Sequence, residues 1–98
     1  TVATEVRRLT LETFRVCGGL DVSRVDFRLD TRNNLQPMIL EINALPGMTS
    51  ISDLTLCAEA EGWTHRQMLQ AIFISAVKRL GLVAAHRLTE LQAEHSAA

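Results

Sequence analysis

Two carboxylates and one amide are the side chains of this 98-residue chain that are candidates for a chemical role. Asp26 lies in the segment SRVDFRLD, and Glu41 and Asn43 lie in the segment LEIN further along the chain. If Asn33 and Asn34 are the central residues of a type I′ turn, Asp26 faces Glu41 on adjacent strands. Opposed carboxylates repel unless a cation or a proton lies between them. Because carboxylate and amide oxygens are hard ligands, this set could hold magnesium and, through it, phosphate groups.

Two predicted antiparallel strands must position these side chains. Apolar and polar residues alternate in both strands, as in a hairpin with one face against a core. The apolar face is expected to consist of Val25, Phe27 and Leu29 from the first strand and Met38, Leu40 and Ile42 from the second. On the other face Arg24 is expected opposite Asn43, whereas Pro37 would pair with Asp30 and weakens the two-residue turn because it lacks an N–H. On the pattern alone, a solvated polar face is the more common explanation of such a hairpin.

Helices are expected on both sides of the hairpin. The first spans residues 2–17. Its apolar stripe should comprise Ala3, Val6, Thr10, Thr13, Phe14 and Cys17. The second runs from about residue 51 to 61, with Ser50 as N-cap and Asp53 completing a variant of the capping box. Ser52 would then lie in the first turn, where free N–H groups suit a carboxylate or a phosphate, although both serines could simply cap the helix.

A third helix should follow the capping box THRQ at residues 64–67 and end before Gly81. Its apolar stripe, expected to pack on the sheet, comprises Met68, Leu69, Ile72, Phe73, Ala76, Val77 and Leu80. The rest of the chain is helix-prone over about residues 84–93 and has no cluster of chemically active side chains. The predicted fold class is therefore α+β, an antiparallel hairpin covered by helices, with residues 1–81 as one subdomain and residues 82–98 as a tail.

Composition argues against several classes of function. The chain is 47% apolar and has a net charge of −1, so nothing in its composition indicates a surface for nucleic acid or an anionic membrane. Cys17 and Cys57 match no metal or redox spacing, and the histidines form no ligand set. Because no secretory signal, transit peptide or long apolar run is recognisable, we expect a cytoplasmic protein. Helical periodicity already runs near residue 2, which suggests a piece of a longer protein.

The motifs SRVDF and LEINALPGMTSIS, followed by a helix, resemble the C-terminal part of the ATP-grasp D-alanine–D-alanine ligases from about Val2 to Leu80. Other ATP-grasp enzymes share an acidic residue on one strand and E-x-N on the next. The longer motif NxxPGMTSxS is similar to this ligase branch in particular. The resemblance implies the C-terminal portion of an ATP-grasp catalytic domain, in an enzyme that joins two D-alanines for peptidoglycan precursor synthesis.

The resemblance also implies a metal site and its ligands. Asp26 and Glu41 would be metal ligands, with Glu41 bridging two ions and Asn43 holding the second ion. The ions would be Mg²⁺ or Mn²⁺, and ATP would be a substrate.

Further roles follow from the same resemblance. Arg24 would steady the acyl-phosphate and the tetrahedral intermediate, and Gly47 would offer its backbone N–H to the same oxyanion. Ser52 would bind the carboxylate of the second D-alanine, in a substrate-binding set that includes Ser50 and Met48.

Other parts that such a ligase needs are missing from this sequence. A ligase that forms an acyl-phosphate from ATP neutralises phosphate charge with lysines and a Gly-rich loop. This chain has a single lysine, Lys78, and no such loop. By resemblance, an N-terminal and a central domain precede Thr1, so the chain alone should be inactive and the full-length enzyme should be a homodimer. Two other interpretations stay open: an ATP-grasp ligase for another carboxylate and amine pair, including D-lactate or D-serine acceptors, and a non-enzymatic binding module.

Overall fold

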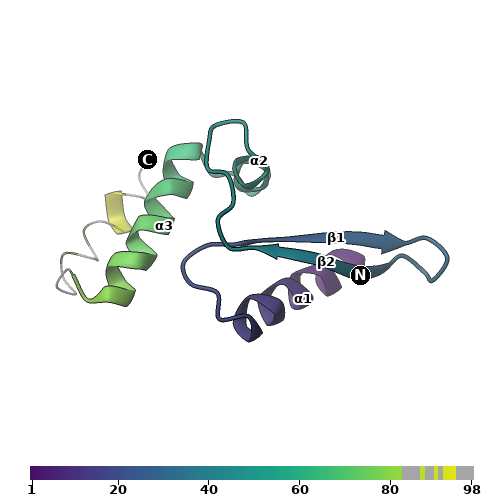
Figure 1. Cartoon of the computed structure of the whole chain (residues 1–98). Helices are drawn as coiled ribbons and strands as arrows, with labels where there is room; N and C mark the ends of the chain where they lie inside the picture. Colours follow the sequence, from purple (N-terminus) through teal and green to yellow (C-terminus); the bar gives the residue numbers. More distant parts are fainter. Residues whose placement is uncertain (83–86, 88–89, 91, 95–98) are drawn as a thin grey trace. The chain divides into compact units, whose positions relative to one another are not determined.

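A computed structural model describes residues 1–82, 87, 90 and 92–94 of the chain. The described elements, in order, are α1 (Val2–Val16), β1 (Arg24–Asp30), β2 (Gln36–Asn43), α2 (Asp53–Ala60) and α3 (His65–Leu80), and Figure 1 shows them. They confirm the predicted α+β class with one two-stranded antiparallel sheet. The chain divides into two compact units, Thr1–Pro46 and Gly47–Ala98, which are described separately below. The extent of a single subdomain over residues 1–81 stays a prediction.

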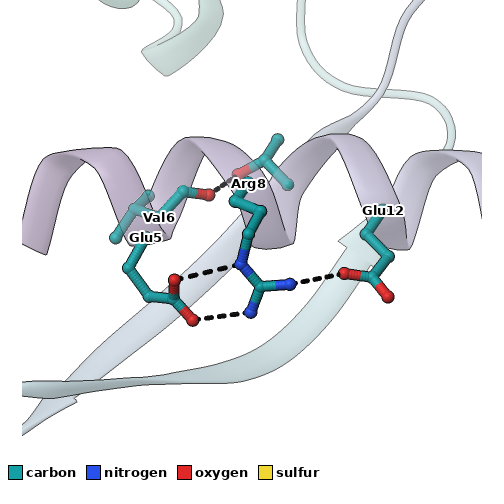
Figure 2. Close-up of polar contacts among 5 residues, drawn as sticks. Glu5, Val6, Arg8 and Glu12 are labelled. Carbon is teal, nitrogen blue, oxygen red and sulfur yellow. Dashed lines mark hydrogen bonds and ion pairs between the residues drawn. The ribbon is translucent and has the colours of Figure 1, made fainter.

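The first helix forms where the sequence predicts it. Thr1 caps α1 by accepting a hydrogen bond from the backbone N–H of Thr4 at 3.1 Å. On its outer face Arg8 lies between two carboxylates, one turn away on either side, at 2.7 Å from Glu5 and 2.9 Å from Glu12 (Figure 2). Pairs three and four residues apart support an exposed helix surface, so this face needs no chemical role.

The inner face of α1 differs from the predicted stripe at its ends. Ala3 and Cys17 are exposed, whereas Leu9, which was not predicted, is half-buried with the middle of the stripe. Leu9 and Thr13 line a shallow hollow with Ile39 of β2, and α1 packs on both strands. The helix therefore covers one face of the hairpin, as Figure 1 shows for this unit.

The strands pair as predicted at the site end of the hairpin and differently at the turn. Asp26 pairs with Glu41, as the sequence predicts. The prediction of a two-residue turn is wrong, because residues 31–35 form a longer loop with positive φ at Asn34 (51°) and Leu35 (58°). Consequently Pro37 does not pair with Asp30. A β-bulge between the pairs of Asp26 and Phe27 adds one residue to β2. From Asp26 back to Arg24, on the side of the bulge away from the turn, the pairing is the predicted one.

The bulge also changes which residues of β2 face the helix. Leu40 is left without a direct partner, whereas Phe27 pairs with Ile39 and Val25 with Ile42. Since directly paired residues share a face, Ile39 replaces Leu40 on the apolar face. Leu40 and Met38, predicted to be internal, are 64% and 51% exposed. The prediction for these two residues is wrong because one extra residue exchanges the two faces of a strand.

The second unit contains α2 and α3, which pack on each other. The predicted capping box of α3 is confirmed: the Thr64 hydroxyl accepts from the Gln67 backbone N–H at 3.1 Å, and the Gln67 side chain accepts from the Thr64 N–H at 2.9 Å. Gly81 ends α3 in the left-handed conformation with φ of 65°. By contrast, α2 starts later than predicted, with Ser52 rather than Ser50 at the N-cap position.

Only part of the predicted stripe of α3 is buried. The buried residues of α3 are Met68, Ile74 and Val77, and Ile74 was not predicted. Phe73 and Leu80, predicted to be internal, are 61% and 57% exposed in this unit. The expectation that α3 packs on the sheet stays a prediction, because the sheet belongs to the other unit.

Three further expectations concern the tail, membrane-spanning helices and the cysteines. The predicted tail helix around residues 84–93 lies largely outside the described residues, of which residues 87, 90 and 92–94 are helical. Among the described residues, no helix is both long enough and apolar enough to cross a membrane. Cys17 and Cys57 are exposed free thiols.

Candidate functional site

Four polar side chains of the hairpin share one face at one end. Arg24 and Asp26 are two residues apart on β1, and Glu41 and Asn43 are two residues apart on β2, so each pair projects to a single side of its strand. The register then places Asp26 opposite Glu41 and Arg24 opposite Asn43. All four predicted residues of the metal site and its neighbour are therefore brought together, on the side of the hairpin away from α1.

The closest interaction in this cluster is an ion pair that the sequence reasoning missed. The Arg24 guanidinium donates to both carboxylate oxygens of Asp26, with Nε 2.9 Å from Oδ1 and Nη2 3.1 Å from Oδ2. The Arg24 guanidinium holds the pKa of Asp26 below its usual value, contact with Glu41 acts in the same direction, and burial opposes both. Spacing of two on a strand could have indicated this pair, since such residues share a face.

This ion pair alters the argument from charge repulsion. The guanidinium compensates the charge of Asp26, so the opposed carboxylates of Asp26 and Glu41 are tolerated without a metal ion. The donor set nevertheless fits Mg²⁺ or Mn²⁺, because it offers two carboxylates and the amide oxygen of Asn43. That oxygen accepts a hydrogen bond from the Leu45 N–H at 3.0 Å, which fixes its direction and leaves it a second lone pair.

No other grouping in the described part of the chain competes with this site for a metal. There, no cluster of three or more histidine, cysteine, aspartate or glutamate side chains lies close enough to hold an ion. The hairpin set is consistent with that finding, because its third ligand is an amide.

The remaining predicted residues lie in a loop of the second unit, residues 47–52. A Cβ on Gly47 would lie 3.4 Å from the Ser52 Cβ, so these two residues are neighbours within the loop. Ser52 is the N-cap residue of α2 rather than a first-turn residue, and its hydroxyl makes no capping hydrogen bond. Instead, it donates to the backbone carbonyl of Thr49 at 2.8 Å. The four hairpin residues belong to the first unit and the residues of the 47–52 loop to the second. The structure therefore brings residues together within each set.

Two residues that sequence reasoning missed also hold the 47–52 loop. The Thr55 hydroxyl donates to the same Thr49 carbonyl at 2.6 Å, and Thr55 is fully buried. The His65 Nε2 lies 2.7 Å from the Met48 carbonyl, so it carries the donated proton. These pairs are separated by 6 and 17 residues in sequence, and no local pattern could have found them.

Comparison with known proteins gives the family. Residues 1–74 match the family described as "D-ala D-ala ligase C-terminus". The chain is 39% identical over 72 residues to a D-alanine–D-alanine ligase of Synechococcus sp. (strain JA-3-3Ab). The matched stretch covers 74% of this chain and 22% of that protein. It is 35% identical over 79 residues to a D-alanine–D-alanine ligase of Bordetella avium, covering 81% of this chain and 24% of that protein.

A third relative carries no functional name. The "Uncharacterized protein y4sG" of Sinorhizobium fredii is 37% identical over 78 residues, covering 80% of this chain and 23% of that protein. The chain thus spans less than a quarter of the length of these three relatives. No solved structure matches the chain significantly. With its matched residues covering most of its length, the chain belongs to the family of D-alanine–D-alanine ligase C-terminal domains.

Proposed function

We propose that this chain is the C-terminal part of an ATP-dependent ligase that joins two D-alanines, and that it carries the metal-binding face and part of the acceptor site. The observation that carries the proposal is the placement of Asp26, Glu41 and Asn43 on one face of two paired strands. Family membership and the names of two relatives support the substrate class. The product would serve peptidoglycan precursor synthesis in the cytoplasm, and the full-length enzyme would be a homodimer.

The hairpin face would bind the phosphates of ATP through metal ions. Asp26, Glu41 and Asn43 would hold two Mg²⁺ or Mn²⁺ ions, which neutralise phosphate charge when bound. One D-alanine carboxylate attacks the γ-phosphate of ATP to form an acyl-phosphate and ADP. Asp26 occupies two of the five N–H donors of Arg24, and this fork fixes the direction of the guanidinium across the face. Arg24 would thereby be oriented to stabilise negative charge on the acyl-phosphate.

The 47–52 loop would bind the second D-alanine. Its amine attacks the acyl carbon, phosphate leaves, and the Gly47 N–H would stabilise the oxyanion. The described residues near Gly47 would accommodate a Cβ at ordinary contact distance, so packing within the unit does not require glycine there. Close approach of a ligand to the backbone is a reason for glycine that remains. Ser52, with Ser50 and Met48 beside it in the loop, would receive the carboxylate of this second substrate.

Replacement of Glu41 by glutamine tests this function in the full-length protein. Glu41→Gln keeps the shape and removes the charge expected to bridge two ions, so D-alanine-dependent release of ADP should fall by at least about 100-fold. Glu12→Gln is the matched control, because Glu12 is an exposed glutamate of the same unit that pairs with Arg8 on α1. Near-wild-type turnover of Glu41→Gln would contradict the metal assignment.

The substrate pair is tested separately with the unmodified full-length protein. ATP consumption is measured with D-alanine alone and with D-alanine plus D-lactate or D-serine. D-alanine alone should support turnover. Turnover that requires a hydroxy acid or another amino acid would replace the D-alanine acceptor, and the absence of ATP consumption with every pair would favour a binding module.

A further inference from the structure

The two successive carbonyls in the middle of the 47–52 loop are both held by side chains from the helices that follow. His65, the first residue of α3, holds the Met48 carbonyl at 2.7 Å, and Thr55 of α2 holds the Thr49 carbonyl at 2.6 Å. Both helices are well anchored where these residues lie, since Thr55 is fully buried and the capping box at Thr64 immediately precedes His65. The loop is thus tied to a rigid part of its unit at two adjacent peptides.

The hydrogen bond from Thr55 to the Thr49 carbonyl matters for Ser52, because Ser52 donates to the same carbonyl. A hydroxyl has one proton to donate, and the Ser52 hydroxyl gives its proton to the Thr49 carbonyl at 2.8 Å. To bind a substrate carboxylate, which only accepts hydrogen bonds, Ser52 must turn this proton away from the loop. The Thr55 hydroxyl can then keep the Thr49 carbonyl paired, because it is buried away from water and already donates to it.

We propose that Thr55 and His65 are positioning residues of the 47–52 loop, and that Thr55 frees the Ser52 hydroxyl to donate to the carboxylate of the acceptor substrate. This inference rests on the proposed function for the identity of the substrate. The Ser52 and Thr55 hydroxyl oxygens are 3.3 Å apart, so the two hydroxyls that donate to the Thr49 carbonyl lie next to each other.

Paired substitutions in the full-length protein separate positioning from general stability. Thr55→Val keeps the shape and removes the donor, whereas Thr55→Ser keeps the donor. His65→Phe and His65→Gln form the corresponding pair for the Met48 carbonyl. Val77→Ala is the stability control, because Val77 is buried in the same unit and is not bonded to the loop.

Two measurements are made on each variant. Hydrogen exchange of the amides in residues 47–52 should become faster by roughly three- to tenfold in Thr55→Val and His65→Phe, the effect of one lost neutral hydrogen bond. The KM for the acceptor D-alanine should rise by a similar factor while the KM for ATP stays the same. Thr55→Ser and His65→Gln should recover most of both losses.

The proposal is overturned if Thr55→Val leaves the exchange of the loop unchanged, or if Val77→Ala matches Thr55→Val in both measurements. It is also overturned if the loop loosens in an active enzyme while the KM for the acceptor stays constant. If the unmodified protein consumes no ATP with D-alanine, the proposed function fails, and the exchange data alone still decide whether Thr55 and His65 position the loop.

Discussion

Replacing Gly19 by alanine should loosen the junction between α1 and β1, the strand that carries Arg24 and Asp26. A Cβ on Gly19 would lie 2.3 Å and 2.4 Å from the Cδ2 and Cε2 of Phe14, and 2.7 Å from its Cγ. Carbon atoms in contact are normally about 3.5–4.0 Å apart. Since Cγ is bonded to the Phe14 Cβ, rotation of the ring about its own axis cannot relieve the overlap.

The backbone cannot easily move away either. The Gly19 N–H donates to the Phe14 carbonyl at 2.7 Å, so the two residues are joined through the main chain as well. The ring must therefore leave its position or the hydrogen bond must lengthen. Overpacking of this kind costs about 1–3 kcal/mol. The expected fall in local protection from hydrogen exchange is roughly 5- to 150-fold.

Hydrogen exchange over residues 14–30 of the full-length protein measures this cost. Gly18→Ala is the matched control, because Gly18 has φ of +70° but no atom within 4 Å of a Cβ. That variant should lose about 1–2 kcal/mol of stability from backbone strain alone. Both substitutions are repeated in a Phe14→Ala background, in which Gly19→Ala should become nearly neutral and Gly18→Ala should remain costly. An equal cost of Gly19→Ala in both backgrounds would refute the overlap argument.

Further predictions concern a helix cap and the ion pair of the site. Thr64→Ala should lower the stability of α3 by about 1 kcal/mol, whereas Thr64→Ser should not. Hydrogen exchange of the first turns of α3 measures the difference. Equal effects of the two substitutions would exclude the cap as the cause. Because the folded pKa of Asp26 is lowered, its ion pair stabilises the fold above the unfolded pKa of about 3.9, and this contribution is lost as pH falls through the folded pKa. In an NMR titration Arg24→Gln should raise the pKa of Asp26, and an unchanged titration would contradict the role given to Arg24.

The register of the candidate metal site could be predicted, although one step of the reasoning was wrong. Alternation along each strand placed Asp26 and Glu41 on one face, and the short connection between the strands placed them opposite each other. The assumed two-residue turn is in fact a loop of residues 31–35. A β-bulge at Leu40 compensates for it before the site is reached, so the pairing of Asp26 with Glu41 is confirmed.

The same bulge explains what the sequence could not predict in the hairpin. Residues on the turn side of the bulge are shifted by one, so Ile39 rather than Leu40 faces α1. A bulge has no period of its own, and it is selected by how the two strands and the covering helix fit together. Burial along α3 fails for a similar reason: periodicity identifies apolar residues, but the packing of neighbouring elements decides that Ile74 is buried and Phe73 is exposed.

The element types and the capping box of α3 could be predicted from the sequence, because each depends on spacing within a few positions. The pairing of Asp26 with Glu41 followed from alternation along two strands and the short connection between them. How the side chains of the candidate site and the loop are held depends on contacts that form on folding. The fork of Arg24 on Asp26 depends on strand geometry, and the ties from Thr55 and His65 to the 47–52 loop join residues 6 and 17 positions apart. The bonds from Thr55 and His65 form only when the chain folds in space, so no local pattern of residues encodes them, whereas the spacing of two between Arg24 and Asp26 could have indicated their pairing.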